Sequence, residues 1–455
     1  MPMRRACPVA VACACAVAGL AGCSSGYSPP ISSCSLPAAH AYALDVTTAG
    51  RVRWQVPVAA PGSSPQVPPL AVGAVAVFAQ GDALYGLRLA DGHRVWSRAG
   101  SQDVAGMWRW QGLVVVLTET PSWSGLPLLT GLDAGTGQAR WTLRIGEGMA
   151  GFYPTADRGL AIGRGFGVLE VVGMSSGQVR WTRSTQSPPG QPAGPAVMAV
   201  GGGAVLIAVN GQLTSYDDRT GQVRWADALM PTHLAADSAE LGLQASAGLV
   251  YMTGVQQLAD GQSTSVLLGI SAADGRVKWR FAPSPPDGSL DAYAPGLISV
   301  TSSSGATWQD ELDPATGRVR WQVASPYHAT VTPSGIVTGP DTVTGPDGVG
   351  TGLISQVSLR DTLTGQTRWT AGLNGGWQPL VVGPGRPSPA LPVFPAGPLL
   401  IVPAAGPDGS DLLAALRMSD GHRAWQVTIP EPVAAPLSAV PGGMLVYTAA
   451  IPLPC

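Results

Sequence analysis

Residues 217–225 read Asp-Asp-Arg-Thr-Gly-Gln-Val-Arg-Trp, and the last five of them, a glycine followed four residues later by a tryptophan, form the pattern that decides the fold. Nine occurrences of this pattern form a series in the 455 residues in which successive tryptophans lie 40 to 56 residues apart. The nine tryptophans are Trp54, Trp96, Trp141, Trp181, Trp225, Trp279, Trp321, Trp369 and Trp425. Self-similarity at such a period indicates one supersecondary unit repeated along the chain.

Each repeat predicts four short strands. Residues 212–216 and 223–225 are predicted strands on either side of Gly221. A glycine between them suits a hairpin whose turn needs a positive φ. Two further apolar runs, residues 196–200 and 204–209, precede that hairpin and are separated by glycines. Strand alternation places Val52 and Trp54 on one face of the last strand and Arg53 on the other. Four antiparallel strands in a unit of this length predict an all-β propeller blade.

Four of the turns carry a fuller motif. Residues 133–141, 217–225, 313–321 and 361–369 share Asp-x-x-x-Gly-x-x-x-Trp with Thr before the Gly, which resembles the tryptophan-docking motif of pyrroloquinoline-quinone-like β-propeller repeats. The resemblance runs from about residue 41 to the C-terminus. It implies that each of the nine tryptophans packs against the neighbouring blade. Arg88, Gly173, Ser271 and Arg417 replace the Asp in other units, where we expect less regular turns.

The number of blades follows from the repeats less directly. Nine hairpins count literally as nine blades, whereas propellers of the family that the motif resembles usually close with seven or eight. We therefore expect eight, with nine left open. The N-terminal hairpin and the apolar runs near residues 436–440 and 444–449 are expected to share one blade, so that N- and C-terminal strands pair and close the ring. The propeller domain is assigned to residues 39–455.

The N-terminus is typical of an exported lipoprotein. Arg4 and Arg5 precede an apolar run over residues 6–21, and Leu-Ala-Gly-Cys ends at Cys23. We predict a signal peptide over residues 1–22, a lipidated tether over 23–38 and acylation of Cys23. The protein would then be held to the membrane by lipid alone, facing outside the cytoplasm. An ordinary secretory signal with a chance cysteine is the alternative.

Two cysteines remain after the signal peptide and the lipidated Cys23 are set aside. Cys34 precedes the N-terminal hairpin and Cys455 ends the chain, so both would lie by the blade that closes the ring. An even pair of cysteines in an exported protein is a disulfide candidate. We predict a Cys34–Cys455 bridge, and the alternative is two free thiols at the termini.

Composition excludes some partners. The chain has 26 Lys and Arg against 28 Asp and Glu, and only 12% of its residues are charged, so it carries no electrostatic footprint for nucleic acid. A basic residue precedes the tryptophan in seven of the nine units. A solvated outer face explains these residues better than a ring of positive charge for an acidic partner.

The sequence offers no catalytic, cofactor-binding or metal-binding set. Quinoprotein dehydrogenases of this fold carry adjacent cysteines beside the quinone, and this chain has none. The Gly-x-Ser-x-Gly match at residues 173–177 falls on a hairpin turn, and the five histidines are scattered, whereas a metal needs three or four converging donors. We expect no cofactor and no enzyme activity.

Trp108 and Trp110 fall outside the docking pattern and share one face of a strand. They are candidates for contact with a partner, and the alternative is that they fill a gap in the core. The favoured function is a non-catalytic, membrane-tethered scaffold that binds another envelope protein or an extracellular ligand, similar to the propeller lipoprotein of the outer-membrane protein assembly complex. The alternative is an envelope enzyme or sensor that uses a quinone or another cofactor.

Overall fold

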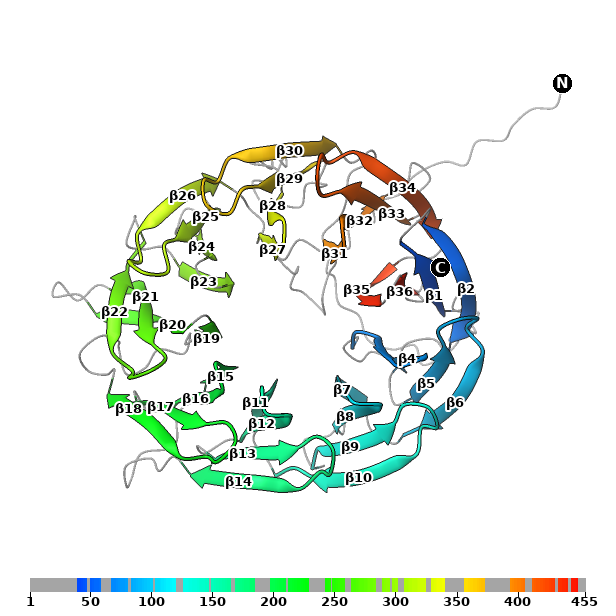
Figure 1. Cartoon of the computed structure of the whole chain (residues 1–455), viewed down its shortest axis with the longest axis horizontal. Helices are drawn as coiled ribbons and strands as arrows, with labels where there is room; N and C mark the ends of the chain where they lie inside the picture. Colours follow the sequence, from blue (N-terminus) through cyan, green and yellow to red (C-terminus); the bar gives the residue numbers. More distant parts are fainter. Residues whose placement is uncertain are drawn as a thin grey trace, which may run out of the picture.

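The ring has nine blades. The computed structural model describes residues 39–46, 50–58, 67–80, 83–100, 103–119, 126–146, 149–164, 168–184, 197–209, 212–228, 242–246, 248–257, 263–283, 289–294, 297–301, 307–324, 329–339, 356–372, 393–405, 411–429, 433–440 and 443–448. Within these residues the secondary-structure elements are all β-strands. They form nine four-stranded antiparallel sheets arranged around one axis (Figure 1). The literal repeat count of nine is confirmed, and the expected eight is wrong, because every repeated hairpin contributes its own blade.

The blades are numbered from the one that joins the two ends of the chain. Blade 1 consists of β35 (Val433–Val440), β36 (Gly443–Thr448), β1 (Ala39–Asp45) and β2 (Arg51–Val58). Blade 2 has β3 (Leu70–Val72), β4 (Val75–Gln80), β5 (Ala83–Arg88) and β6 (Arg94–Ala99); blade 3 has β7 (Asp103–Trp110), β8 (Leu113–Glu119), β9 (Leu128–Asp133) and β10 (Ala139–Arg144). Blade 4 has β11 (Met149–Pro154), β12 (Gly159–Arg164), β13 (Val168–Gly173) and β14 (Val179–Ser184).

The remaining blades follow the same order. Blade 5 has β15 (Val197–Gly201), β16 (Ala204–Val209), β17 (Gln212–Asp217) and β18 (Val223–Ala228); blade 6 has β19 (Gly242–Ser246), β20 (Leu249–Gln257), β21 (Ser263–Ser271) and β22 (Val277–Phe281). Blade 7 has β23 (Ser289–Ala294), β24 (Leu297–Thr301), β25 (Thr307–Leu312) and β26 (Val319–Ala324). Blade 8 has β27 (Thr330–Thr332), β28 (Gly335–Thr338), β29 (Gln356–Arg360) and β30 (Thr367–Gly372); blade 9 has β31 (Phe394–Ala396), β32 (Leu399–Ala405), β33 (Asp411–Arg417) and β34 (Arg423–Ile429).

Blade 1 closes the ring as the sequence predicts. Its strand order is β2-β1-β36-β35, with Tyr42 paired to Val446 and Leu44 to Met444. The blade thus takes two strands from each end of the described chain. Because one sheet contains both ends, separating them requires breaking a ladder of backbone hydrogen bonds rather than only side-chain contacts.

Each docking tryptophan joins its blade to the next one. Its Nε1 donates a hydrogen bond of 2.8–3.3 Å to a backbone carbonyl in the turn between the third and fourth strands of the following blade. In chain order the nine acceptors are the carbonyls of Leu89, Ala134, Met174, Asp218, Ala272, Pro314, Thr362, Met418 and Val46. The bond from Trp425 to Val46 completes the circle between blades 9 and 1.

The turn glycine meets two demands at once. Gly221 has φ +67°, and a Cβ on it would lie 2.6 Å from Cδ2 of Trp181 in the preceding blade. The turns that lack the Asp are as regular as the others: Gly92, Gly177, Gly275 and Gly421 have φ of +68° to +76°, and each donates at 2.8–2.9 Å to the carbonyl four residues earlier. Our expectation of less regular turns is therefore wrong, because the glycine and the backbone bonds fix the turn without the Asp.

A β-bulge interrupts the last strand of every blade. The pairing shifts by one residue just before the tryptophan, so the residue preceding it is the extra one. The bulge corrects the predicted alternation, since Val52 is 41% exposed although Trp54 is 6% exposed. It also turns the preceding side chain, most often an arginine, towards the turn.

Apolar side chains fill the seams between neighbouring blades. The seam of blades 3 and 4, for example, contains Val115, Leu129, Ile162 and Val172, all fully buried. Strand β25 departs from this composition because Gln309, Asp310 and Glu311 are buried on it. Gln322 on the adjacent β26 donates to Asp310 at 2.8 Å.

Candidate functional site: a charged and aromatic cluster on one face

One face of the ring carries two of the strand connections of each blade. Because the strands are antiparallel, the turn between the first and second strands of a blade lies at the same edge as the turn between the third and fourth strands. We call this edge the hairpin face, the first kind of turn the inner turn and the second kind the outer turn. In blade 5 these turns are residues 202–203 and residues 218–222.

Ion pairs cross many outer turns. In blade 5, Oδ2 of Asp217 accepts from Nη2 of Arg224 at 2.8 Å, while its Oδ1 accepts from the backbone N–H and hydroxyl of Thr220 at 2.9 and 3.0 Å. We call this Asp–Arg pair a turn strap. It recurs as Asp133–Arg140, Asp313–Arg320 and Asp361–Arg368.

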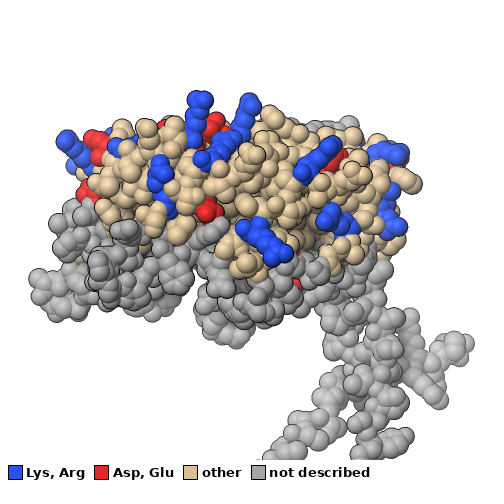
Figure 2. Space-filling model, turned by 90° about the horizontal axis from the view of Figure 1, so that it is seen from below, with Lys and Arg blue, Asp and Glu red and all other residues tan. Residues whose placement is uncertain are grey.

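The straps change the electrostatics of the rim. The Arg224 guanidinium holds the pKa of Asp217 far below its ordinary value, and Arg320 and Arg368 lower the pKa values of Asp313 and Asp361 to about 2. Each strapped carboxylate therefore stays ionised and offsets its arginine. Figure 2 shows basic side chains spread over the wall with acidic ones beside several of them, rather than a continuous positive band.

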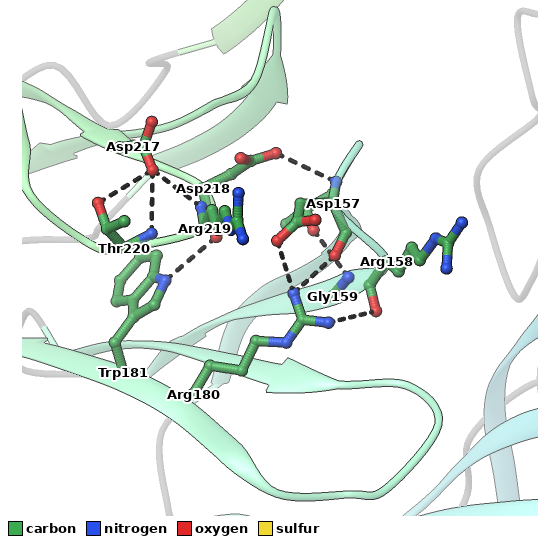
Figure 3. A network of polar contacts seen from close by, with 10 residues as sticks. Asp157, Arg158, Gly159, Arg180, Trp181, Asp217, Asp218, Arg219 and Thr220 are labelled. Atoms are coloured by element: carbon green, nitrogen blue, oxygen red, sulfur yellow. Dashed lines mark hydrogen bonds and ion pairs between the residues drawn. The ribbon is translucent and has the colours of Figure 1, made fainter.

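Blade 4 uses its arginine differently. Gly173 stands where the straps have Asp, so Arg180 reaches the inner turn of its own blade (Figure 3). Its Nη1 donates to the carbonyl and to Oδ2 of Asp157 at 2.6 and 3.0 Å, and its Nη2 donates to the carbonyl of Arg158 at 3.4 Å. Arg224 and Arg368 also donate to inner-turn carbonyls, those of Gly202 and Ser334, while they bind their Asp. Without an acid at position 173, Arg180 binds the inner turn alone.

The inner turn of blade 4 is also fixed from blade 5. The backbone N–H of Asp157 donates to Oδ2 of Asp218 at 3.4 Å, and the carbonyl of Asp218 accepts from Trp181 at 3.1 Å (Figure 3). Asp218 is 4% exposed, and burial raises its pKa above the ordinary range. Thr155 closes the turn by accepting at its hydroxyl from Gly159 at 2.9 Å. The turn that carries Arg158 is therefore held by two blades.

Arg158 lies over an aromatic ring of blade 3. Its guanidinium carbon is 5.7 Å from the ring centre of Trp110, within the range of a cation–π contact. Arg158 is exposed and Trp110 half-buried, and the indole Nε1 is shielded from solvent with no hydrogen-bond partner among the described residues. We call Trp110, Asp157, Arg158, Arg180 and Asp218 the rim cluster.

Trp108 packs beside the rim cluster, in the seam between blades 3 and 4. It shares one face of β7 with Trp110, and its ring lies 5.7 Å from that of Phe152 in blade 4. Both tryptophans pack against the apolar seam of blades 3 and 4. Trp108 thus fills the seam, while Trp110 also reaches the hairpin face through Arg158.

The rim cluster breaks the repetition of the inner turns. By the strand bounds given above, Asp157 and Arg158 are the only charged residues in the sequence between the first and second strands of any blade. The sequence analysis did not single out Asp157, Arg158 or Asp218. The signal that could have found them is this lone charged pair, taken together with the missing acid at Gly173.

Three residues with predicted roles, Cys23, Cys34 and Cys455, lie outside the described residues. In the ranges that the structure describes, no three His, Cys, Asp or Glu side chains are placed to hold a metal ion, and no helix has the length and apolar character needed to cross a membrane. The residues 173–177 form a turn between two strands. What the rim cluster offers chemically is a guanidinium over an aromatic ring on a turn fixed by two blades.

Similar folds occur among solved structures. BamB from Moraxella catarrhalis is 17% identical, with 69% of this chain and 87% of that chain covered and a TM-score of 0.43. The quinohemoprotein alcohol dehydrogenase from Comamonas testosteroni is 12% identical, with 86% and 69% covered and a TM-score of 0.40. The computationally designed Ika8 protein is 14% identical, with 78% and 96% covered and a TM-score of 0.47.

Sequence comparison is more specific. No curated protein matches the chain. A family model described as outer membrane protein assembly factor BamB matches residues 38–148 and 165–339, which is more than half of the chain and includes the docking motifs of seven blades. The chain therefore belongs to the BamB-like family of pyrroloquinoline-quinone-type β-propellers.

Proposed function

We propose that this protein is a non-catalytic scaffold that binds another protein of the cell envelope through its hairpin face. The observation that carries the proposal is the rim cluster, where Arg158 lies over Trp110 on a turn fixed by Arg180 and Asp218. Arginine and tryptophan are enriched among the residues that dominate binding energy at interfaces, and a pre-ordered turn reduces the entropy lost on binding. The family's description, which names an outer membrane assembly factor, supports a protein partner.

Within the rim cluster, Trp110 and Arg158 would contact the partner. Trp108 was a candidate for the same role, but its contact with Phe152 favours support of Trp110 from within the seam. The indole Nε1 of Trp110 is buried without a hydrogen-bond partner among the described residues, so a partner group that accepts a hydrogen bond would satisfy it. An unpaired buried donor costs free energy, so engaging it would favour the complex.

The proposed scaffold is tethered to the membrane through an acylated Cys23, with residues 1–22 removed as a signal peptide. Cys23→Ser should move the protein from the membrane fraction to the soluble fraction or leave it unprocessed. Stable anchoring takes more than one acyl chain, so the wild-type protein should stay with the membrane during a salt wash. Wild-type protein that carries no lipid would refute the tether.

A disulfide between Cys34 and Cys455 would staple the closing blade. Strand β1 begins shortly after Cys34 and β36 ends shortly before Cys455, and these two strands pair in blade 1. Peptide mapping without reduction, on protein made in an oxidising compartment, should recover the two cysteines in one cross-linked pair. Recovery of both as free thiols would refute the bridge.

Capture from living cells tests the binding function. Full-length protein is cross-linked in the envelope, and the proteins attached to it are identified for the wild type and two variants. Arg158→Ala should lose the main captured protein. Arg219→Ala, which removes another exposed arginine from a turn on the same face, should retain it.

An absorbance measurement on the purified full-length protein distinguishes the scaffold from the cofactor-dependent alternative. Adding pyrroloquinoline quinone and calcium should leave the absorbance equal to the sum of the components. A new absorbance band with turnover of an electron acceptor would favour the enzyme or sensor over the scaffold.

A further inference from the structure

Blades 2 and 9 share a second departure from the turn strap. Residues 88–96 and 417–425 both follow Arg-x-x-Asp-Gly-His-Arg-x-Trp. In both, an arginine takes the position of the strap's Asp, and the residue before the tryptophan is not basic but Val95 or Ala424. Neither blade can therefore form the strap seen in blades 3, 5, 7 and 8.

The two arginines end in different surroundings. In blade 2, Nη1 of Arg88 is 2.8 Å from Oδ2 of Asp91, a normal hydrogen-bonded ion pair. In blade 9, Nε of Arg417 is 3.7 Å from Oδ1 of Asp420, and that oxygen already accepts from the backbone N–H of His422 at 2.9 Å. The guanidinium of Arg417 makes no hydrogen bond within the described residues, so its donors remain available.

A hollow of about 650 Å³ opens beside Arg417 on the hairpin face. It lies over blade 9, which Figure 1 shows between blades 8 and 1, and we call it the blade 9 hollow. Its lining is mainly apolar, with Arg368 and Arg417 as its charged residues; the lining residues are Val46, Ser334, Arg368, Ala396, Pro398, Leu399, Arg417, Met418, Ser419, Ala424 and Trp425. This volume lies in the usual range of ligand pockets, roughly 300–1,000 Å³.

The missing strap accounts for the hollow. Ala424 lines it at the bulge position, where the strapped blades carry the arginine that reaches across the outer turn. A methyl group in place of that long side chain leaves the space open. Arg368 of blade 8 borders the space but is already bound to Asp361 and to the carbonyl of Ser334 at 2.8 Å. Arg417 is thus the cation available to a ligand.

We propose that the blade 9 hollow binds a segment of the protein partner that carries a carboxylate beside a large apolar side chain. The inference rests on the proposed function, because it takes the partner to be a protein. Arg417 would bind the carboxylate with two parallel N–H···O bonds, which a guanidinium forms and an ammonium does not. Met418, Leu399 and Trp425 would cover the apolar side chain. Among the described residues, no acidic side chain lines the hollow, and the carboxylate that a ligand would have to displace from the guanidinium is that of Asp420, 3.7 Å from Nε.

The test rebuilds the strap in this blade. Arg417→Asp with Ala424→Arg copies the pair of blades 3, 5, 7 and 8, fills the hollow and removes the available cation. Arg88→Asp with Val95→Arg makes the matching change in blade 2 as a control. Thermal unfolding of both variants should stay close to that of the wild type, because the introduced pair already exists in four blades.

Binding is measured with fluorescent N-acetyl-Phe-Asp-Phe-amide and its Asn counterpart on the full-length protein. The Asp peptide should bind the wild type and the blade 2 variant equally. It should bind the rebuilt blade 9 variant at least about tenfold more weakly, as should the Asn peptide with the wild type. Equal binding to the rebuilt variant, equal binding of the Asn peptide, or no binding to the wild type would overturn the inference.

The outcome is separate from that of the proposed function. Failure of the peptide to bind leaves the capture experiment with Arg158→Ala untouched. Failure to capture any protein, with the Asp peptide bound as expected, would instead overturn the protein scaffold while locating an acidic ligand at Arg417.

Discussion

Replacing single glycines in blade 5 separates the two demands on the turn glycine. Gly221 has φ +67° and lies against the ring of Trp181, so that a Cβ would approach Cδ2 to 2.6 Å. Gly202, in the inner turn of the same blade, has φ +60° with no atom within 4 Å of an added Cβ. Gly221→Ala and Gly202→Ala therefore share the cost of a left-handed backbone and differ in the contact with the tryptophan.

The magnitudes follow from these two contributions. Placing an L-residue in the left-handed region costs roughly 1–2 kcal/mol, and this cost lowers the unfolding free energy of both variants. Displacing an indole that is 7% exposed and bonded to the Asp218 carbonyl adds overpacking of typically 1–3 kcal/mol for Gly221→Ala alone. We expect a free energy of unfolding lower by about 1–2 kcal/mol for Gly202→Ala and by about 2–5 kcal/mol for Gly221→Ala.

Urea unfolding followed by tryptophan fluorescence and by far-ultraviolet circular dichroism measures both values. The combined variant Trp181→Ala, Gly221→Ala then tests the cause, because removing the ring should cancel the overpacking and make the two losses less than additive. Equal destabilisation by the two glycine variants, or strict additivity with Trp181→Ala, would refute the stacking of the turn on the preceding blade.

Further predictions concern other parts of the ring. Trp225→Ala should cost about 3–5 kcal/mol because Trp225 is 8% exposed and bonded to the Ala272 carbonyl, and denaturant unfolding should give a smaller loss for Trp110→Ala; equal losses would contradict the docking role. Burial raises the pKa of Glu311 to about 7 although Arg320 opposes the shift, so its folded form holds the proton more tightly than the unfolded chain. The stability gained from the protonated Glu311 is then complete below about pH 4.5 and is lost as the pH rises through 7. Glu311→Gln should therefore reduce the fall in unfolding free energy between pH 5 and 8 by on the order of 1–2 kcal/mol, and an unchanged pH profile would contradict this. Arg180→Ala should speed amide hydrogen exchange in residues 155–159 with less than about 1 kcal/mol of global destabilisation, and unchanged exchange would show that Arg180 does not hold the inner turn.

The sequence predicted those parts of the fold that depend on neighbouring residues. A glycine and a tryptophan four residues apart indicate a turn and the strand after it, so the repeats predicted the blades. The N-terminal hairpin and the two C-terminal apolar runs each supply half a blade, which predicted that the two ends pair in blade 1. The choice of eight blades failed because it relied on other propellers rather than on the nine hairpins. The exposure of Val52 was missed because a bulge shifts the alternation, and the residue types around it do not mark a bulge.

The candidate site could be predicted only in part. The sequence placed Trp108 and Trp110 on one face, and the structure keeps them there. Their different roles depend on Phe152 and Arg158, which come from the next blade. Contacts between blades depend on how two repeats are placed side by side, and no spacing along the chain reports that. Arg180 shows the same limit. The sequence shows that position 173 lacks an acid, but it does not show that the inner turn lies close enough to bind Arg180 instead.

Site-specific photo-cross-linking in living cells tests most directly the claim that a partner protein binds the hairpin face at the rim cluster. A photoreactive phenylalanine analogue is placed at Gln111, which is exposed beside Trp110, and in a separate variant at Leu126, which is 39% exposed just before β9 of the same blade, at the edge opposite the hairpin face. We predict one discrete adduct with an envelope protein from position 111, lost when Arg158→Ala is added, and no such adduct from position 126. The same adduct from positions 111 and 126, or none from position 111, would contradict the account.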